Sequence, residues 1–229
     1  MKPYVICHMC TTIDGRILSN RWPRLAGKSP ASLFESTADS FRIGAWLVGT
    51  TTMSEFAGRQ RKLPRAGRRV ERTDHVADPR ARRFAIGADA KGKLRFDEAD
   101  VDGDHVVLLV SERASNDYLA HLQDAGVSYL FCGEDEVDVT VALDKLHRVL
   151  GIKKLLLEGG GTFNGAVLGA GLVDEISQVV VPVVDGGRGI ATMFDIPGDH
   201  PTKAAAALRF KSHRTLPGGV SWVRYQVRT

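Results

Sequence analysis

The chain has 229 residues, of which 43% are apolar and 25% are charged, which is the balance of a globular domain with one substantial core. No apolar stretch reaches the roughly 18 residues that a membrane-spanning helix needs. The first residues carry one lysine and no small-residue cleavage site, so they predict a strand and not a signal peptide. Three cysteines are too few for a disulfide framework, and we therefore expect a cytoplasmic protein.

Cys7 and Cys10 have the C-x-x-C spacing that is typical of redox and zinc sites. In a strand, these two side chains would point to opposite faces, because successive side chains alternate. The sequence contains no second C-x-x-C that could complete a four-ligand site. We expect no metal.

The net charge of +4 is concentrated in one segment of the chain. Residues 58–83 contain ten Lys or Arg against three acids, a local charge of +7 that leaves −3 for the rest. A solvated, mobile loop is the interpretation that we favour, and the alternatives are capture of a phosphorylated small ligand and nucleic-acid binding. The segment has no Phe, Tyr or Trp on which bases could stack, so we expect no nucleic-acid partner. We expect a basic, loop-like insertion at residues 58–82.

Runs of apolar and β-branched residues predict the strands. In chain order these strands are Tyr4–Cys10, Ala45–Thr50, Arg83–Ala88, His105–Val110, Ser128–Cys132, Lys153–Glu158, Glu175–Val183, Ala205–His213 and Val220–Val227. Helical periodicity predicts helices at Pro30–Phe41, Asn116–Ala125, Thr140–Leu150 and Thr162–Ala170. Ser29 and Thr162 are the expected N-caps of the first and the last of these helices.

Strands and helices alternate over the first 175 residues, which predicts a mostly parallel sheet with helices on both faces. The last strands follow one another without a helix between them, and we expect them to add an antiparallel edge. The chain has no repeat and no linker. We therefore expect a mixed α/β fold of three layers in a single domain, residues 1–229.

Three glycines, Gly159, Gly160 and Gly161, follow a predicted strand and precede a helix. The Walker pattern is excluded because no Gly-Lys-Ser/Thr follows, and G-x-G-x-x-G is excluded because Asn164 occupies its last glycine position. Glycines at this place let backbone N–H groups approach a ligand closely, at a helix end that favours negative charge. A pyrophosphate site and a tight structural turn both fit the pattern.

Polar residues also follow three other predicted strands. Gly49 and three threonines follow the second strand, and two glycine-containing strand ends at one edge of a parallel sheet are where open α/β folds bind ligands. Asp14 stands in an Asp-Gly turn, where it either serves the turn alone or accepts hydrogen bonds from a ligand. Ser111 and Arg113 form either a phosphate-binding pair or a surface turn.

Four stretches together resemble one family: PYVICHMCTTIDGRI (Pro3–Ile17), AWLVGTTTM (Ala45–Met53), RRFAIGADAKGKL (Arg82–Leu94) and LLLEGGGTFNGAVLGAGLVDEISQVVVPVVDGG (Leu155–Gly187). They are similar to the 5-amino-6-(5-phosphoribosylamino)uracil reductases of riboflavin biosynthesis, which have a dihydrofolate-reductase-like fold. The resemblance implies an NADPH-dependent oxidoreductase that transfers hydride to C1′ of a ribosylamino-pyrimidine phosphate and gives a ribitylamino product. It also implies a cytoplasmic homodimer that needs no metal.

The resemblance assigns roles to residues of this chain. The implied cofactor contacts are Gly49, Thr50 and Thr52 at the nicotinamide cofactor, Ser111 and Arg113 at its 2′-phosphate, and Gly159, Gly160, Gly161 and Thr162 at its pyrophosphate. The implied substrate contacts are Thr12, Asp14 and Arg16. Asp14 and Glu158 are expected to organise proton delivery. A cis peptide between Gly159 and Gly160 is expected from the wider fold.

One helix departs from the family. Its members usually carry an arginine-rich helix before the second strand, whereas helix 30–41 of this chain carries Glu35 and Asp39. Either the substrate phosphate is held elsewhere, or the substrate is another pterin-like or small carbonyl compound. The alternative phosphate contacts are Arg16, Arg21, Arg24, Lys28 and segment 58–83.

A second feature of the sequence, besides the resemblance, indicates a homodimer. The apolar run Ile176–Val184 is expected at an edge of the sheet, where it would be a liability if it were left exposed.

Overall fold

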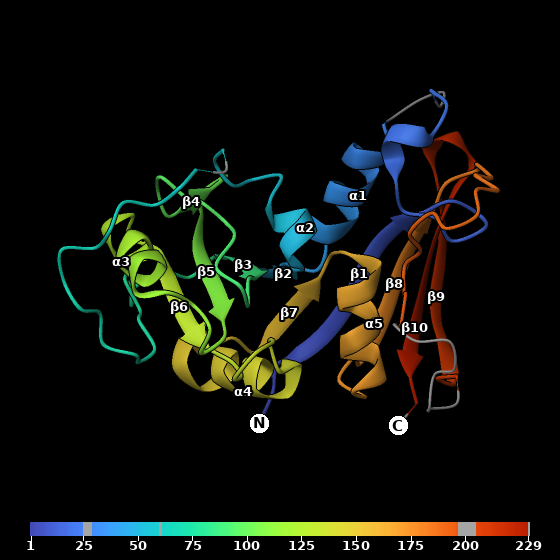
Figure 1. The fold of residues 1–229 in the computed structure, drawn as a ribbon. Coiled ribbons are helices and arrows are strands. Elements are labelled where there is room, and N and C mark those ends of the chain that lie inside the picture. The colour runs from blue at the N-terminus through green and yellow to red at the C-terminus, as the bar shows by residue number, and fades with distance from the viewer. Residues whose placement is uncertain (25–28, 60, 197–204, 229) are drawn as a thin grey trace. The chain divides into compact units, whose positions relative to one another are not determined.

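The computed structural model describes residues 1–24, 29–59, 61–196 and 205–228 of the chain (Figure 1). Its contacts group into two compact units, a first unit of Met1–Pro3 and Gly44–Leu155 and a second unit of Tyr4–Ile43 and Leu156–Thr229. Strand β7 (Lys154–Leu157) carries the chain from the first unit into the second. Lys28, one of the predicted phosphate contacts, lies outside the described residues. Within those residues, no helix has the length and apolar character that crossing a membrane requires.

The first unit is built on parallel strands in the spatial order β2 (Ala45–Val48), β3 (Phe84–Ala88), β5 (Asp104–Val110) and β6 (Ser128–Phe131). Every residue of β3 and of β6 is buried, as expected for parallel strands that are covered on both faces. A short strand, β4 (Asp100–Val101), forms an antiparallel hairpin with β5. The sequence did not predict β4, because a two-residue strand has no periodicity of its own.

Helices α2 (Thr50–Met53), α3 (Asn116–Asp124) and α4 (Val139–Leu150) belong to the first unit. Ser115 caps the start of α3 and Asp138 caps the start of α4, each by accepting backbone N–H groups of the first turn. Gly151, with a φ of +68°, ends α4 in the left-handed conformation that favours glycine. These local signals explain why the predicted bounds of α3 and α4 agree closely with the structure.

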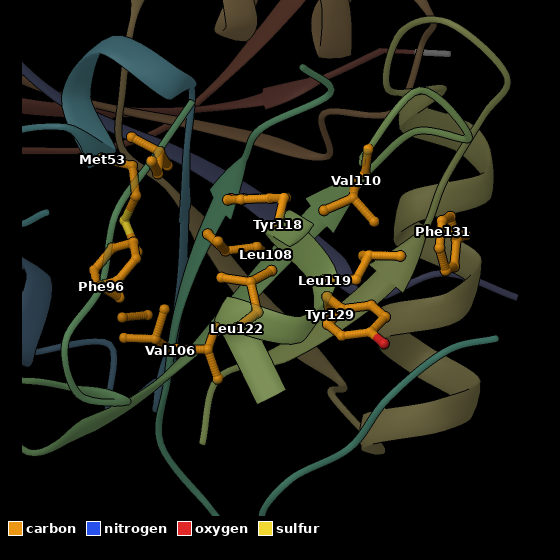
Figure 2. Packing of buried hydrophobic residues seen from close by; sticks show 14 of the residues in the cluster. Met53, Phe96, Val106, Leu108, Val110, Tyr118, Leu119, Leu122, Tyr129 and Phe131 are labelled. Atoms are coloured by element: carbon orange, nitrogen blue, oxygen red, sulfur yellow. The ribbon is translucent and has the colours of Figure 1, made fainter. Parts of the chain in front are cut away.

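The core of the first unit lies between α3 and one face of the parallel strands (Figure 2). Most of the side chains labelled in Figure 2 come from α3, β5 and β6, while Met53 comes from α2 and Phe96 from the loop before β4. The labelled residues of α3 and the strands are Val106, Leu108, Val110, Tyr118, Leu119, Leu122, Tyr129 and Phe131. Burying one such leucine contributes roughly 2 kcal/mol to stability. Because Met53 is anchored in this core, the short helix α2 and its threonines are fixed at the carboxyl end of β2.

The basic segment 58–83 runs across the first unit and is held there by its backbone. The N–H groups of Ala66 and Val70 donate to side chains at the start of α3, at 2.8 and 2.7 Å, and Val70 is buried in the core. His75 pairs with Tyr129 of β6 through backbone hydrogen bonds of 2.9 Å in both directions.

Several arginines of this segment form ion pairs within the same unit, namely Arg61 with Asp97, Arg68 with Asp124 and Arg72 with Glu112. Residues 58–59 and 61–83, the part of the segment that the structure describes, form no helix. Most residues of the described segment are exposed, as expected for a solvated loop, while its backbone is hydrogen-bonded to α3 and β6. The sequence could not show this, since the partners lie far along the chain.

In the second unit, β1 (Tyr4–Thr11) and β8 (Glu175–Val180) run parallel. Strand β10 (Val220–Val227) pairs antiparallel with β8, and β9 (Leu208–Leu216) pairs antiparallel with β10. Figure 1 shows β8, β10 and β9 side by side in that order. The antiparallel tail is therefore as predicted.

The expectation that Ile176–Val184 forms an exposed edge is wrong. Strand β8 covers its first part and is flanked on both sides, by β1 and by β10. Among the described strands, β9 is the one at the edge of this unit, with β10 as its partner. Edge position depends on the order in which distant strands pair, and apolar periodicity does not report that order.

Helices α1 (Pro30–Asp39) and α5 (Gly161–Gly169) belong to the second unit. Ser29 caps α1 as predicted, and its Oγ accepts from the N–H of Ser32 at 3.1 Å. Thr162 does not cap α5, because the helix begins one residue earlier and its N-cap is Gly160. The described elements make a mixed α/β fold with mostly parallel strands and antiparallel C-terminal strands, as predicted.

Candidate active site

A pocket of about 390 Å³ opens in the first unit at the carboxyl ends of β2 and β3. It is lined by residues of α2, of the loop after β3 and of the loop before α4: Thr50, Thr51, Ser54, Asp89, Ala90, Lys91, Lys93, Leu94 and Glu136. Hydroxyl groups and two lysines dominate this lining. Such a set of groups suits an anionic ligand with several oxygen atoms.

Asp89 lines the pocket and fixes the turn beside it. Its side chain is buried, and its carboxylate accepts the N–H of Lys93 at 2.9 Å, the N–H of Leu94 at 2.7 Å and the hydroxyl of Tyr118 at 2.6 Å. Burial, followed by the nearby Asp89 charge, raises the pKa of Tyr118 well above its usual value, so this hydroxyl stays a donor. The turn that carries Lys91 and Lys93 is therefore fixed by a carboxylate that is itself anchored on α3.

Lys91 lies 3.0 Å from Glu136 across the pocket, and both side chains are mostly exposed. An exposed ion pair of this kind contributes little to stability. An incoming phosphate can replace Glu136 as the partner of Lys91 at little cost. The donor set of this pocket therefore fits a phosphate group of a nucleotide.

The predicted contacts of the first unit divide into two groups. Gly49 is the N-cap of α2, and Thr50 lines the pocket while its Oγ1 donates to the carbonyl of Ala88 at 2.6 Å. Thr52 lies in the same helix but does not line the pocket. Of the five predicted residues, Thr50 alone lines this pocket, and Gly49, Thr52, Ser111 and Arg113 lie outside its lining.

Ser111 is fully buried, and its hydroxyl donates to the carbonyl of Ala90 at 2.7 Å and accepts the N–H of Arg113 at 3.1 Å. The guanidinium of Arg113 forms an exposed pair with Asp135. Ser111 therefore ties the loop after β5 to the loop that forms the pocket. Lys91 and Lys93 were not predicted as site residues, although the sequence has a Lys-Gly-Lys that begins three residues after the end of a predicted strand.

In the second unit, the turn after β1 brings together the predicted substrate contacts. Thr12 Oγ1 donates to Asp14 at 2.6 Å and accepts the N–H of Arg16 at 2.9 Å. The guanidinium of Arg16 donates to the carbonyl of Ile190 at 2.6 Å, and its Nε lies 3.7 Å from Asp14. Thr12, Asp14 and Arg16 are thus neighbours, and they bind one another and the loop after β8.

Asp14 also accepts two backbone N–H groups of that loop, from Asp185 at 3.1 Å and from Gly186 at 2.9 Å. The hydrogen bond from Thr12, followed by those from Gly186 and Asp185, holds the pKa of Asp14 well below its usual range. Asp14 is therefore ionised at every pH at which the protein would work. An ionised carboxylate accepts hydrogen bonds and has no proton to give.

The glycine triplet enters α5 of the second unit. Gly160 has a φ of +70°, which favours glycine, and it offers no side chain to cap the first turn of the helix. Gly161 has no room for a Cβ, because that atom would overlap the carbonyl of Thr192 and the carboxylate of Asp195. No cis peptide occurs in the described part of the chain, so the expected cis bond between Gly159 and Gly160 is not found. The triplet is thus in part a tight structural turn.

Glu158 directly precedes the triplet and is partly buried. Burial, and then the charge of Glu158, raise the pKa of the Cys7 thiol well above its usual value. Burial also raises the pKa of Cys10 to about 12. These thiols are protonated at neutral pH and are poor metal ligands. No cluster of three or more His, Cys, Asp or Glu suited to a metal is found among the described residues.

Arg21 and Arg24, two further predicted phosphate contacts, lie among the described residues. Arg21 pairs with Asp185, while Arg24 is exposed. Glu35 and Asp39, the acids that depart from the family pattern, are exposed on α1. Neither acid is therefore buried against the core of the second unit.

Two named proteins are similar to the chain over most of its length. It is 30% identical over 224 residues to a protein of Methanothermobacter thermautotrophicus named 2,5-diamino-6-ribosylamino-4(3H)-pyrimidinone 5′-phosphate reductase, and the match covers 94% of each chain. A protein of Archaeoglobus fulgidus with the same name is 27% identical and covers 85% of this chain and 87% of its own.

Solved structures share the fold at low sequence identity. A pyrimidine reductase-like protein of Corynebacterium diphtheriae has a TM-score of 0.69 at 17% identity, with coverage of 99% of this chain and 92% of that chain. The riboflavin biosynthesis reductase Rib7 of Saccharomyces cerevisiae has a TM-score of 0.62 at 14% identity, with coverage of 99% and 90%. The predicted dihydrofolate-reductase-like fold is confirmed.

The model of one family, described as the RibD C-terminal domain, matches residues 3–222. This range includes the pocket of the first unit and the clustered turn and glycine triplet of the second. The chain therefore belongs to the RibD C-terminal domain family, among the reductases of riboflavin biosynthesis.

Proposed function

We propose that this chain is an NADPH-dependent reductase that acts on a ribosylamino-pyrimidine 5′-phosphate. In this reaction the C1′–O4′ bond of the ribose breaks, C1′ receives a hydride, and O4′ receives a proton, which gives a ribitylamino product. The observation that carries the proposal is the full-length likeness to a named reductase of this class, at 30% identity. The whole chain is proposed to be one reductase domain, because the family match runs through both units.

The pyrimidine of the proposed substrate carries an amino group at C2. The relatives from Methanothermobacter and Archaeoglobus are named for the 2,5-diamino-pyrimidinone, whereas the resemblance found in the sequence pointed to the uracil form, with an oxygen at C2. The two compounds differ in the hydrogen bonds that C2 offers, since an amino group donates and a carbonyl accepts. We propose the diamino compound as the substrate and the uracil compound as the alternative.

NADPH supplies the hydride when it is bound. In the first unit, Lys91 and Lys93 together with the hydroxyls of Thr51 and Ser54 supply the donors that a 2′-phosphate needs, which supports NADPH over NADH. In the second unit, Gly160 leaves the first turn of α5 without a capping side chain, and backbone N–H groups at such a helix end suit a pyrophosphate.

Asp14 is proposed to stay ionised and to take no part in proton transfer. Glu158, at the end of β7, is then the predicted acid that remains for proton delivery. This assignment differs from the sequence-based expectation, in which both acids shared the role. The reason is that Asp14 already accepts three hydrogen bonds.

The purified protein should be mixed with NADPH and, in separate reactions, with the diamino compound, the uracil compound, a dihydropterin and a simple aldehyde. We expect loss of the absorbance of reduced nicotinamide with the diamino compound, and a ribitylamino product by mass spectrometry. Turnover of the pterin or the aldehyde alone would refute the proposed substrate and leave the reductase class standing. No oxidation of NADPH with any of the four would refute the reductase.

A homodimer in the cytoplasm is proposed as the working state, on the strength of the family resemblance. Light scattering on the purified protein tests the homodimer, and a monomeric mass would refute it. If it dimerises, the exposed side chains of the edge strand β9, such as Phe210, are the first to examine.

A further inference from the structure

The loop that follows β8 connects two features of the second unit that lie far apart in the sequence. At one end, residues 185–187 meet the turn after β1 that carries Asp14. At the other end, residues 192–195 meet the first turn of α5, which the glycine triplet enters. Hydrogen bonds from side chains and from backbone groups make this connection along the loop.

At the first end, two carboxylates hold the loop. Asp14 accepts the N–H groups of Asp185 and Gly186. The side chain of Asp185, which is 2% exposed, accepts Nε of Arg21 at 2.8 Å, Nη2 of Arg21 at 3.1 Å and the N–H of Gly187 at 3.0 Å. Both ends of this bend are thus fixed by charge-assisted hydrogen bonds, which are the strong ones. We call Asp14, Asp185 and Arg21 the carboxylate clamp.

Between the two ends, the loop stays paired with the turn after β1. The N–H of Ile17 donates to Ala191 at 3.2 Å, and the N–H of Met193 donates to Gly15 at 3.2 Å. The loop cannot slide along the turn without breaking these bonds. A displacement at residue 185 is therefore passed on to residue 193.

At the second end, the loop packs directly on α5. The N–H of Asp195 donates to the carbonyl of Gly161 at 2.9 Å, and Asn164 donates through Nδ2 to the carbonyl of Met193 at 3.1 Å. The backbone of Asp195 also lies against Gly165, where a Cβ would have no room. The position of the first turn of α5 is therefore set by the loop.

We propose that Asp14 and Asp185 are positioning residues, which fix segment 185–195 through the carboxylate clamp and thereby set the position of the α5 N-terminus that binds the cofactor. The charged groups that face Asp14 are Arg16 at 3.7 Å and, through Asp185, Arg21. The effect on the cofactor rests on the function proposed above. The clamp itself can be measured without any ligand.

The test uses Asp14→Asn in the full chain. Asparagine keeps the shape of the side chain, but its amide group replaces one of the oxygens that accept a hydrogen bond. The matched control is Asp144→Asn on α4 of the first unit, where the aspartate pairs with Arg148 and has no contact with the clamp. Arg21→Gln is the milder second variant, because Arg21 is 43% exposed and its loss leaves the core intact.

The first measurement is hydrogen exchange of the ligand-free protein. In Asp14→Asn, the amides of Asp185 and Gly186 and those of the first turn of α5 are expected to exchange about tenfold faster or more, with no change in the Asp144→Asn control. Arg21→Gln should give a smaller increase at Gly187. Unchanged exchange at Asp185 and Gly186 in Asp14→Asn would overturn the clamp, whatever the protein binds.

The second measurement is the dissociation constant of NADPH, followed by kcat against pH. A positioning role predicts an NADPH dissociation constant raised about tenfold, with kcat reduced by less than about threefold and the pH profile unchanged. If kcat falls more than about a hundredfold at unchanged affinity and a limb of the pH profile disappears, Asp14 transfers a proton and the positioning role is refuted. If the wild-type protein does not bind NADPH at all, the proposed function fails, while the exchange experiment still decides the clamp.

Discussion

The two units build their polar sites from carboxylates in different ways. In the first unit, Asp89 is buried under the pocket and is anchored on Tyr118 within the apolar core. In the second unit, Asp14 and Asp185 bind backbone N–H groups of a surface loop and an exposed arginine. The first arrangement couples the site to the stability of the whole unit, whereas the second couples it to the position of one loop. Substitution of Asp89 should therefore destabilise the first unit, whereas substitution of Asp14 or Asp185 should release one loop of the second unit.

The largest effect is expected from Asp89→Ala. This change leaves the buried hydroxyl of Tyr118 and the N–H groups of Lys93 and Leu94 without their acceptor, which costs about 3 kcal/mol or more in the free energy of unfolding. Urea denaturation followed by circular dichroism measures it, with the half-buried Asp144→Ala on α4 as the control. An unfolding midpoint equal to that of the control would show that Asp89 does not anchor the pocket, and the contrast between the units would fail.

His8 on β1 is one of the polar groups of the second unit that are as deeply buried as Asp89. Trp222 Nε1 can only donate, so Ser177 Oγ accepts from it at 2.8 Å and has its own proton for Nδ1 of His8, at 2.9 Å. Nε2 then carries the proton of the imidazole and points to Thr37 Oγ1 at 3.1 Å. The neutral ring satisfies its partners on both sides. Burial lowers the pKa of His8 from 6.5 to about 4.

Acid should therefore destabilise the second unit through His8. The folded-state pKa lies below the unfolded value, so the unfolded chain binds more protons between pH 6.5 and 4, and stability falls as the pH falls through this window. The loss reaches about 3 kcal/mol below pH 4. Burial also lowers the pKa of His75, His105 and His121, which act in the same direction. The informative quantity is therefore the difference in unfolding free energy between the wild type and His8→Gln, measured from pH 7 to pH 4. A difference that does not change with pH would contradict the assignment.

Gly161→Ala distinguishes packing from ligand approach at the glycine triplet. The new Cβ meets backbone atoms of Thr192, so either the loop or the helix must shift, at about 2 kcal/mol. The control is Gly67→Ala in the first unit, where nothing lies within 4 Å of the position that a Cβ would take. Thermal unfolding without ligand gives both values. A ligand-free Gly161→Ala as stable as the wild type would mean that the glycine is kept for the cofactor alone.

The smallest effect concerns the choice of cofactor. Lys93→Gln and Lys91→Gln remove cations from the pocket and should raise the KM for NADPH about tenfold or less, while the KM for NADH stays the same, because NADH has no 2′-phosphate. Lys62→Gln, an exposed lysine outside the pocket lining, is the control. Arg113→Gln should be measured alongside. If the KM for NADPH rises only in Arg113→Gln, the 2′-phosphate lies at the predicted pair Ser111 and Arg113 and not in the pocket.

Much of the fold could be predicted because its signals are local. Ser29 before Pro30 and Gly151 after α4 mark helix ends through hydrogen bonds and backbone angles within a few residues. The sequence did not predict β4, because two residues are too few to show an apolar periodicity. It also did not predict that β8 lies between β1 and β10. The order of strands depends on pairings between residues more than a hundred positions apart, such as His8 with Ser177.

The candidate site was predicted in part for the same reason. Asp14, Glu158 and the glycine triplet were predicted as site residues because each lies at or after the end of an apolar strand, and strand ends mark the ligand edge of an α/β sheet. Their roles stay predictions. Lys91 and Lys93 were not predicted as site residues, because two lysines in a loop are typical of any solvated turn. Only the structure shows that the carboxylate of Asp89 fixes this turn beside the pocket. The sequence predicted Ser111 as a cofactor contact and did not predict the hydrogen bond from its hydroxyl to the carbonyl of Ala90, which lies 21 residues earlier in the chain.

The sequence by itself determined the family, the alternation of strands and helices, and the strand ends at which polar residues gather. These are properties of short stretches, because apolar periodicity, caps and glycine runs act within one element. Only the tertiary structure decided that Asp14 is held by Asp185 and Gly186, and that Gly161 is a glycine because Thr192 and Asp195 pack on it. Which group a carboxylate binds, and how much room a glycine leaves, depend on chain segments that meet only when the protein folds.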